Sequence, residues 1–517
     1  MAVNFVDIMT VPYFLSLDNL KVPAILAAFV CLLAWILWPS GRLPPGPKPL
    51  PIIGNIHQLK GQNAVHQFQA WHKLYGPIIS VQLGPKTVIS IGSHRVARDL
   101  LTQRSQIYSS RPRFPILDEC MFRGLSTVLL PYGRRWRLHQ RLQWHFLKAA
   151  VAPTYRPAQD VESKQLLHDL LSTNEFKPLF LRLPYSLNST LAYSTRIEAN
   201  NGNTIKVMAS ASKEVEAIAN SPGGSLVEMI PALNSLPSWL TPWKKQGARA
   251  FHRINALYER NRAAGEASPS WNWIKGAIGA KEAQGIPHEE LTHIIGFIFE
   301  VGGEVVSGVL QVFVLAAVTF PKAMEKAKQE LERVVGLGRL PDFDDLPHLP
   351  YTCAVVTETL RWRTIAPLGF PHMNCEEDEY EGYRIPKGTT ILPNHWAMDM
   401  DEEVFDCPGE FRPERWLENP DLPLAAYGFG RRSCAGRHIG QDTVRIVVAR
   451  LLWAFDITPL EEVDPFNMVP GLLSPPKHFS VQFKIHTREQ QEIIEREWAG
   501  VEKNPHVFMR TFGPNSI

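Results

Sequence analysis

The residues with the clearest capacity for chemistry lie near the C-terminus, in a glycine-rich turn around Cys434. Residues 427–436 read Tyr-Gly-Phe-Gly-Arg-Arg-Ser-Cys-Ala-Gly, and a helical stretch begins directly afterwards, near Arg437. Backbone amides at a helix N-terminus and neighbouring arginines favour the ionised form of such a cysteine. The pattern therefore indicates a thiolate that acts either as a nucleophile or as a metal ligand.

The surroundings of Cys434 favour the metal ligand. A nucleophilic thiolate needs a general base, and the sequence shows no His/Asp partner pattern for one. A single cysteine in an arginine-rich loop suits a haem better, with the thiolate on the iron and Arg432 on a propionate. A simply buried cysteine is the remaining alternative.

The turn resembles the haem loop of the cytochrome P450 superfamily, Phe-x-x-Gly-x-Arg-x-Cys-x-Gly. Gly430, Arg432, Cys434 and Gly436 occupy the matching positions, and Tyr427 stands where phenylalanine is usual. Other marks of the superfamily occur in the expected order, so the resemblance covers roughly residues 20–490. It implies a haem cofactor with Cys434 as the axial iron ligand and with Gly430, Gly436 and Arg432 as cofactor-binding residues.

A charged network is the next mark. Glu358 and Arg361 are three residues apart, so they share one face of a predicted helix. Glu358-Thr359-Leu360-Arg361 looks like the Glu-x-x-Arg motif of the superfamily, and 411–416 looks like the Pro-x-Arg segment that follows it. The resemblance implies that Arg415 joins the pair in a buried network supporting the haem loop. A solvated surface pair is the alternative.

The resemblance also implies contacts to the haem propionates. His372 occupies a position that serves this role, with a surface histidine as the alternative. The Trp-x-x-x-Arg motif corresponds to Trp136 and Gln140, so glutamine replaces the expected arginine. Glutamine can donate a hydrogen bond but brings no charge. His139 and Arg141 are candidates to compensate.

The most informative departure lies in 301–306, Val-Gly-Gly-Glu-Val-Val. The superfamily usually has an acid followed by threonine here; the acid is kept as Glu304, a predicted catalytic residue, but Val305 replaces the threonine. The glycine pair suggests close approach of a ligand or a local opening of the helix. A substrate hydroxyl could replace the threonine, or Glu304 with water could suffice, with Glu300 as a helper. Chemistry that depends less on oxygen insertion is the third interpretation. The alternative for Glu300 is a charge on the outer side of its helix or a member of a salt bridge.

These motifs must be positioned mostly by helices. Strands are expected at Ile78–Leu83 and Thr87–Ile91, as a hairpin, and at Thr389–Leu392. Residues 237–290 suggest only short helical runs on a variable surface, with a shortened G helix of the superfamily. The predicted fold class is mainly α with minor β (α+β), the cytochrome P450 fold. Apolar periodicity predicts long helices at Leu291–Thr319, Lys322–Val335, Thr352–Arg361 and Gln441–Phe455.

The N-terminus predicts a membrane anchor. No charged residue occurs from Val22 to Gly41, and the adjacent charges place the larger part of the chain in the cytosol. We therefore expect a luminal segment at 1–21, a transmembrane helix at 22–41, a Pro-rich hinge at 42–51 and a haem-thiolate catalytic domain at 52–517. This matches a single-pass endoplasmic reticulum protein of microsomal type. A cleaved signal peptide or a buried core helix is the alternative.

Composition restricts the partners. With 54 Lys+Arg against 51 Asp+Glu, the charge is too balanced for a chain that mainly binds nucleic acid. No dinucleotide-binding fingerprint occurs, so the resemblance implies electrons from NADPH through a separate cytochrome P450 reductase. Segments between the motifs look like fungal enzymes of secondary metabolism, which implies monooxygenation of a lipophilic substrate. Oxidative coupling, ring rearrangement or desaturation without oxygen insertion, or silent haem binding, is the alternative.

Overall fold

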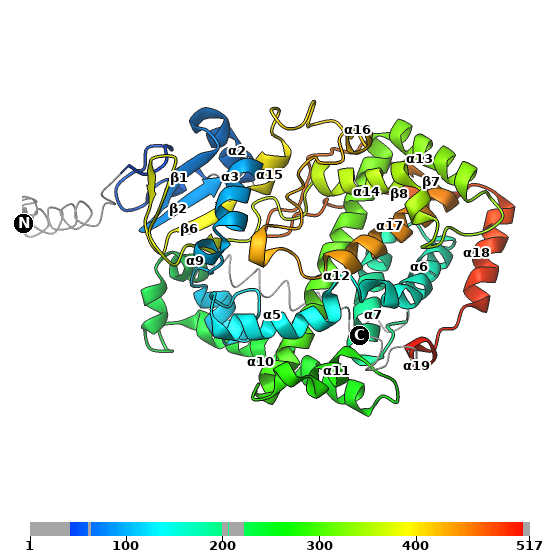
Figure 1. The fold of residues 1–517 in the computed structure, drawn as a ribbon, viewed down its shortest axis with the longest axis horizontal. Coiled ribbons are helices and arrows are strands. Elements are labelled where there is room, and N and C mark those ends of the chain that lie inside the picture. The colour runs from blue at the N-terminus through cyan, green and yellow to red at the C-terminus, as the bar shows by residue number, and fades with distance from the viewer. Residues whose placement is uncertain (1–41, 60–63, 199–204, 206–221, 510–517) are drawn as a thin grey trace, which may run out of the picture.

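The structure is a computed structural model, which describes residues 42–59, 64–198, 205 and 222–509. The predicted luminal segment at 1–21 and the predicted anchor at 22–41 lie outside the described residues. Helices dominate the described chain, which confirms the mainly α class with minor β (Figure 1). The helices are α2 (Ala64–Tyr75), α3 (His94–Ala97), α4 (Ser105–Tyr108), α5 (Arg134–Leu147), α6 (Arg156–Leu170), α7 (Phe176–Tyr193), α9 (Pro222–Met229), α10 (Pro242–Ala267), α11 (Trp273–Gly279), α12 (His288–Thr319), α13 (Pro321–Val334), α14 (Pro350–Trp362), α15 (His395–Asp399), α16 (Arg415–Glu418), α17 (Arg437–Ala454), α18 (Arg488–Gly500) and α19 (Pro505–Phe508).

Three small sheets accompany the helices. The predicted hairpin is confirmed as antiparallel strands β1 (Ile78–Leu83) and β2 (Lys86–Ile91). β2 pairs in parallel with β6 (Thr390–Pro393), and β6 pairs with β3 (His372–Met373), which fixes His372 opposite Ile391. The remaining strands form two-stranded sheets, β4 (Asp378–Tyr380) with β5 (Tyr383–Ile385) and β7 (Phe455–Pro459) with β8 (Val481–Ile485).

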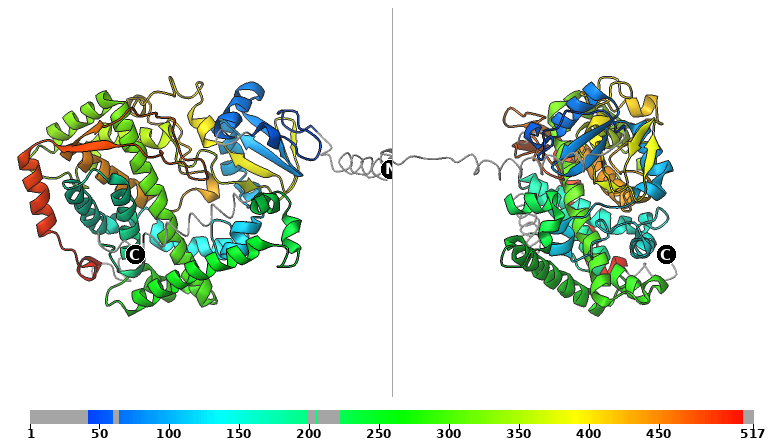
Figure 2. Two further views of the ribbon diagram at one scale, coloured as in Figure 1. Left: turned by 180° about the vertical axis from the view of Figure 1, so that it is seen from behind. Right: turned by 90° about the vertical axis from the view of Figure 1, so that its left-hand side faces the viewer.

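The long apolar helix α12 crosses the helical part of the molecule (Figure 2). It packs most extensively against α7 and also contacts α10, α14 and α17. Among the described residues it is the one helix long and apolar enough to span a membrane, but 61% of its apolar window is buried inside the protein. Its apolar character is explained by this burial, since a helix surrounded by other helices is apolar on all sides.

The expectation of only short helical runs in 237–290 is wrong. α10 is a continuous helix from Pro242 to Ala267, so the region corresponding to the G helix is not shortened in this way. Its buried side recurs at helical spacing and includes two glycines that allow close packing. Gly247 lies where a Cβ would be 2.6 Å from Cβ of Cys120, and Gly265 packs against Ile274. The glycines that suggested interruptions are therefore packing positions.

The Pro-rich segment lies against the sheet. The hydroxyl of Ser80 on β1 donates to the Pro44 carbonyl at 2.7 Å, and the Ser80 amide donates to the Pro45 carbonyl at 2.9 Å. Asn55 donates from its side chain to the Pro47 carbonyl at 3.2 Å. A Cβ on Gly46 would lie 2.0 Å from the Ser80 carbonyl oxygen, so the backbones are in close contact. The segment follows β1 as an ordered strap.

Candidate active site

Cys434 opens onto a cavity of about 370 Å³ between α12 and α17. The amide of Cys434 donates to the Tyr427 carbonyl at 2.8 Å, which closes the turn. Gly430 has a φ of +54°, and a Cβ there would lie 2.0 Å from the Leu101 carbonyl oxygen. Only glycine satisfies both conditions, so the loop can present the sulfur in this position. Gly436 lies at the end of the turn, directly before α17.

Burial raises the pKa of the Cys434 thiol, whereas a hydrogen bond from the Gly436 amide and the charge of Arg437 lower it. Desolvation is the larger effect, so the pKa of the Cys434 thiol lies above its ordinary value. A metal cation deprotonates a coordinating thiol outright. The site therefore has the chemistry of a sulfur that becomes a thiolate when iron binds.

Two arginines gather at one end of the cavity, of which Arg111 is buried and Arg432 is half-buried. Arg432 donates to the carbonyls of Ser109 and Leu130 at 2.8 and 2.7 Å, and its guanidinium lies 4.2 Å from the centroid of the buried Trp136 ring. Arg111 donates to the Pro371 carbonyl at 2.6 Å. Neither arginine forms an ion pair with any of the described residues, and burial lowers the pKa of both.

Arginines that line one cavity, are buried or half-buried and form no ion pair with a described residue fit an anionic ligand, because a charge shielded from water is costly without a partner. Together with the sulfur they fit haem, whose propionates would approach the arginines. The sequence reasoning missed Arg111. Its signal was the sequence Ser-Arg-Pro at 110–112, in which proline holds the backbone extended beside the arginine.

His372 is buried and lies beside this pair. Its Nδ1 is 2.8 Å from the Tyr108 carbonyl oxygen, so Nδ1 carries the proton. Burial and the nearby Arg111 and Arg432 hold the pKa of His372 well below its ordinary value. In the neutral form Nε2 has only a lone pair, and His372 can donate to a propionate only after gaining a second proton. His372 is not among the described residues that line the cavity, so its propionate role stays a prediction.

Gln140 lines the cavity, and its side-chain amide donates to the Arg431 carbonyl at 3.2 Å. The two candidates to compensate for the missing charge point elsewhere. His139 is buried between Thr127 and Glu290, with Nε2 2.6 Å from the Glu290 carboxylate, and Arg141 is exposed. Arg111 supplies the second cation instead.

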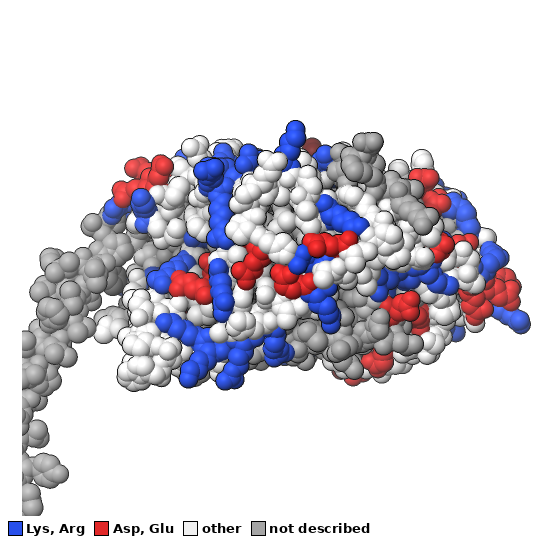
Figure 3. Space-filling view, turned by 90° about the horizontal axis from the view of Figure 1, so that it is seen from below, with Lys and Arg blue, Asp and Glu red and all other residues white. Residues whose placement is uncertain are grey.

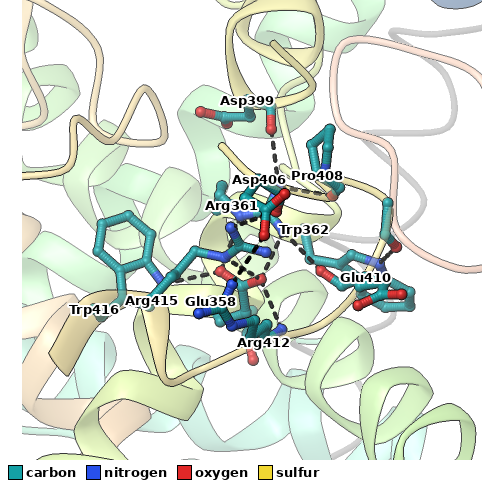
Figure 4. A network of polar contacts seen from close by, with 12 residues as sticks. Glu358, Arg361, Trp362, Asp399, Asp406, Pro408, Glu410, Arg412, Arg415 and Trp416 are labelled. Carbon is teal, nitrogen blue, oxygen red and sulfur yellow. Dashed lines mark hydrogen bonds and ion pairs between the residues drawn. The ribbon is translucent and has the colours of Figure 1, made fainter. Parts of the chain in front are cut away.

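Glu358, Arg361 and Arg415 come together in a buried network (Figure 4). The Glu358 carboxylate accepts two hydrogen bonds from Arg361, at 2.6 and 2.9 Å, and one from Arg415 at 3.2 Å. The indole of Trp416 and the Arg412 amide also donate to it, at 2.9 and 3.0 Å. The alternative of a solvated pair is therefore excluded.

The remaining N–H groups of Arg361 cross-link distant parts of the chain. They donate to the carbonyls of Asp399, Pro408 and Glu410 at 2.8, 2.9 and 3.1 Å. α14 thereby holds α15 and the segment that leads to Arg415 and on to the Cys434 loop. Such a fully hydrogen-bonded charge cluster fixes the path of irregular backbone.

A family model described as cytochrome P450 matches residues 44–483. The chain belongs to the cytochrome P450 family. It is 40% identical over 497 residues to "Cytochrome P450 monooxygenase drtD" of Aspergillus calidoustus, covering 95% of each chain. It is 42% identical over 466 residues to "Cytochrome P450 monooxygenase aneD" of Aspergillus aculeatus, covering 88% of this chain and 90% of the relative. It is also 36% identical over 510 residues to "Fumitremorgin C synthase" of Aspergillus fumigatus, covering 92% and 96%.

The family match and these relatives make the protein an oxidoreductase of the cytochrome P450 monooxygenase class. The family binds haem through a cysteine thiolate and uses a redox partner and a small-molecule substrate. The relatives are fungal P450 monooxygenases of secondary metabolism, as the resemblance implied. Cys434 lies in the loop of this P450 that resembles the haem loop of the family.

The part of α12 that faces the P450 cavity has a different local structure from the one expected. Val301, Gly302 and Val305 line the cavity, and the helix is continuous through them. A Cβ on Gly302 would lie 2.5 Å from the side-chain nitrogen of Asn188 on α7, and one on Gly303 would lie 2.7 Å from the Tyr185 ring. The two glycines therefore allow α7 to pack closely against α12. The expectation of a local opening of the helix is wrong.

Glu304 is half-buried one turn after Glu300, outside the described residues that line the cavity. Its charge contributes to the raised pKa of the buried Tyr185, so the two side chains are near each other. The hydroxyl of Tyr185 has no hydrogen-bond partner among the described residues. A catalytic role for Glu304 stays a prediction.

Glu300 is buried, so the interpretation as a charge on the outer side of the helix is wrong. Its carboxylate accepts a short hydrogen bond from Tyr258 on α10. Burial raises its pKa to about 7, with a smaller contribution from the charge of Glu304. The folded protein consequently holds a proton on Glu300 at a pH where the unfolded chain has lost it.

We expect Glu300→Gln to remove a pH dependence of stability. Between about pH 4.5 and 7 the folded state binds more protons than the unfolded state, so this group's contribution to stability falls as pH rises, by about 3 kcal/mol in all. Urea unfolding at about pH 5 and 8 gives the free energy of unfolding of each protein. Relative to the wild type, that of the variant should be higher at pH 8 than at pH 5. Glu332→Gln, an exposed change on α13, serves as control; parallel pH profiles for Glu300→Gln and wild type would contradict the expectation.

Proposed function

We propose that this P450 is a haem-thiolate monooxygenase that oxidises a lipophilic intermediate of a fungal secondary metabolite. The observation that carries the proposal is the cavity that joins Cys434 to the buried Arg111 and the half-buried Arg432, neither of which forms an ion pair with a described residue. Cys434 would hold the iron, Arg111, Arg432 and Trp136 would hold the propionate end, and Gly430 and Gly436 would shape the loop. Bound haem supplies the activation of dioxygen with electrons from a redox partner.

The described walls of the cavity support a lipophilic substrate. Phe297, Ile298, Val301, Val306 and Ile365 line it with apolar side chains. Small-molecule sites of this kind are apolar pockets in which a few polar groups set orientation. Among the polar groups here, Asn188 reaches the cavity from α7 while its amide donates to the Phe299 carbonyl at 3.2 Å.

In this P450, Glu304 and water would supply protons to the active site. Glu300, one turn earlier on α12, would assist them. Val305 presents no hydroxyl to the cavity, so water or a hydroxyl of the substrate would take the place of the threonine hydroxyl as proton donor. A missing hydrogen bond to a charged group costs about 1.5–3 kcal/mol. Val305 is also the observation that favours the second candidate, oxidative coupling, rearrangement or desaturation without oxygen insertion.

Isotope labelling tests the proposal against this second candidate. The purified protein with reductase and NADPH is given candidate substrates under 18O-labelled dioxygen, and products are analysed by mass spectrometry. Label in the product supports monooxygenation. Product without label identifies the second candidate, and a haem protein that forms no product with any pathway intermediate overturns both.

Electron delivery would come from an NADPH-cytochrome P450 reductase docked on a basic face. Lys and Arg side chains lie among acids on the side that carries α5 and α10 (Figure 3). Arg445 on α17 is only half-exposed and its Nε is buried, so it is not counted with this face. The exposed arginines on α5 and beside the Cys434 loop are Arg134, Arg135, Arg137, Arg141, Arg431 and Arg437.

Reduction of the protein by the reductase is expected to slow at least about tenfold between low and high salt, because exposed charges more than about 3 Å apart are screened at 1 M. Stopped-flow measurement of the first electron transfer tests this. Reduction by dithionite is the control, since a small reductant does not need the basic face. A salt-independent enzymatic rate would count against docking there.

A membrane location would place this P450 at the endoplasmic reticulum with its catalytic domain in the cytosol. Exposed apolar side chains support it on the described surface: Ile52 is 67% exposed and Trp239 76%. Ile52 and Met229 both lie near Gly84 at the β1–β2 turn, so the strap and α9 are neighbours. Apolar side chains gathered at one end of a domain are typical of a membrane contact.

Two fractionation experiments check the location. The protein is expected to stay in the membrane pellet after alkaline carbonate washing of microsomes, as a spanning helix requires. Protease added to intact microsomes is expected to digest the catalytic domain, because that domain faces the cytosol. Release by carbonate would refute the anchor, and protection from protease would refute the orientation.

A further inference from the structure

A second cavity, of about 340 Å³, lies beside the Cys434 cavity. It is bounded by the start of α2, the end of α14, α15 and the loop at 466–477. Thr364 and Pro367 line the second cavity, whereas Ile365 between them lines the Cys434 cavity. A single stretch of chain therefore forms a wall common to both.

A buried cation, Arg363, lines this side cavity. It is 2% exposed and forms no ion pair with a described residue. Its Nε and Nη1 donate to the carbonyls of Pro465 and Trp362 at 2.8 and 2.9 Å, and its Nη2 makes no hydrogen bond to the part of the chain that is described. Three rings pack around the guanidinium, with the centroids of Trp362, Phe466 and Trp396 at 4.0, 4.4 and 5.4 Å.

The rest of the lining adds positive charge and an unsatisfied hydroxyl. Lys477 and His66 also line the side cavity, and the described lining contains no carboxylate. The Thr364 hydroxyl is buried without a hydrogen-bond partner among the described residues. Asp464, which is exposed, is close enough to raise the pKa of Arg363, but burial and Arg361 outweigh it and lower that pKa to about 9.

We propose that the side cavity binds an organic anion, a carboxylate carried on an apolar body. Aromatic rings around the guanidinium leave N–H groups for a carboxylate, which an arginine binds more strongly than a neutral acceptor. Met468, Val469 and Leu368 offer apolar walls for the rest of the molecule. The site is separate from the cavity of Cys434 and does not depend on which substrate is oxidised there.

Indole-3-propionate is a suitable probe, and its neutral amide, indole-3-propionamide, is the matched ligand. Titration calorimetry of the full-length, haem-loaded protein should show the acid binding at least tenfold more tightly than the amide. The titration is repeated with saturating imidazole, which occupies the haem cavity. Binding that survives imidazole belongs to the side cavity; binding that imidazole abolishes, or equal affinity for acid and amide, overturns the proposal.

Variants assign the binding to named groups. Arg363→Met should lose at least tenfold in affinity for the acid, and Thr364→Val and Lys477→Met a few-fold each, with the affinity for the amide unchanged. Lys477 is half-exposed, so its variant remains informative if Arg363→Met fails to fold. Arg488→Met, on α18 and 86% exposed in its side chain, is the control. Wild-type affinity for the acid in both Arg363→Met and Lys477→Met would show that Arg363 only holds the chain together and would overturn the site.

Discussion

Replacing Cys434 with serine is expected to abolish the absorption band that reduced, carbon monoxide-bound P450s owe to their thiolate ligand, and with it all turnover. Serine keeps the size of the side chain and the backbone turn, but a hydroxyl is not deprotonated by iron as readily as a thiol. The loop geometry, held by the Cys434 amide and Gly430, should survive. The measurement is the difference spectrum of the reduced, purified variant with carbon monoxide minus the reduced variant without it.

A matched control separates ligand loss from general damage. Cys375→Ser replaces a half-buried thiol whose Sγ lies 3.6 Å from the Gln106 carbonyl oxygen and which does not line the Cys434 cavity among the described residues. It should give a normal spectrum and normal turnover. An unchanged spectrum and activity in Cys434→Ser would refute the assignment of the iron ligand and every site role that depends on it.

Glu358→Ala is expected to prevent haem incorporation by destabilising the fold. Removing the carboxylate leaves Arg361 and Arg415 buried as neighbouring cations, and breaking a buried pair costs about 3–5 kcal/mol. That is a large part of the stability of an ordinary domain, which is about 5–15 kcal/mol. Arg361→Ala should behave alike, because it also frees three carbonyls in the segment leading to the haem loop. Haem content per protein and the urea midpoint are the measurements.

Arg412→Ala is the control for the network. Its side chain is 33% exposed and pairs with Asp406 and Glu418 at the surface, so its loss should cost about 0–1 kcal/mol. Its contact with Glu358 comes from the backbone amide, which alanine retains. Equal haem content in Glu358→Ala and Arg412→Ala would show that the buried network does not support the haem loop.

Short motifs with fixed spacing gave the most reliable predictions. The turn at Cys434, the pair of Glu358 and Arg361, and the β1–β2 hairpin each depend on neighbouring residues or on one helix face, and the structure contains all three. Arg415 is 57 residues from Glu358, and its place in the network came from the resemblance. The region of α10 was misjudged because its glycines lie in the buried stripe, where they serve close packing. Whether a glycine interrupts a helix or allows close packing depends on the neighbouring helix. A local sequence pattern does not show which helix that is.

The sequence did not reveal the surroundings of two buried residues, Arg111 and Glu300, because these depend on tertiary contacts. Arg111 becomes a cavity cation only because the Pro371 carbonyl and Arg432 lie across from it. Glu300 was interpreted as a charge on the outer side of its helix, but Tyr258 from α10 gives it an interior hydrogen-bond partner. Both lie far in sequence from the groups that define their chemistry.

The strap formed by Pro44, Pro45 and Pro47 sets where the N-terminus can be trimmed for crystallisation or expression in bacteria. A chain beginning at residue 42 keeps the carbonyls that Ser80 and Asn55 bind. A chain beginning at residue 52 would strip the cover from β1 and leave an unpaired strand edge, which invites intermolecular sheet formation. A truncation that also removes the strap would therefore expose a new aggregation-prone surface, the edge of β1.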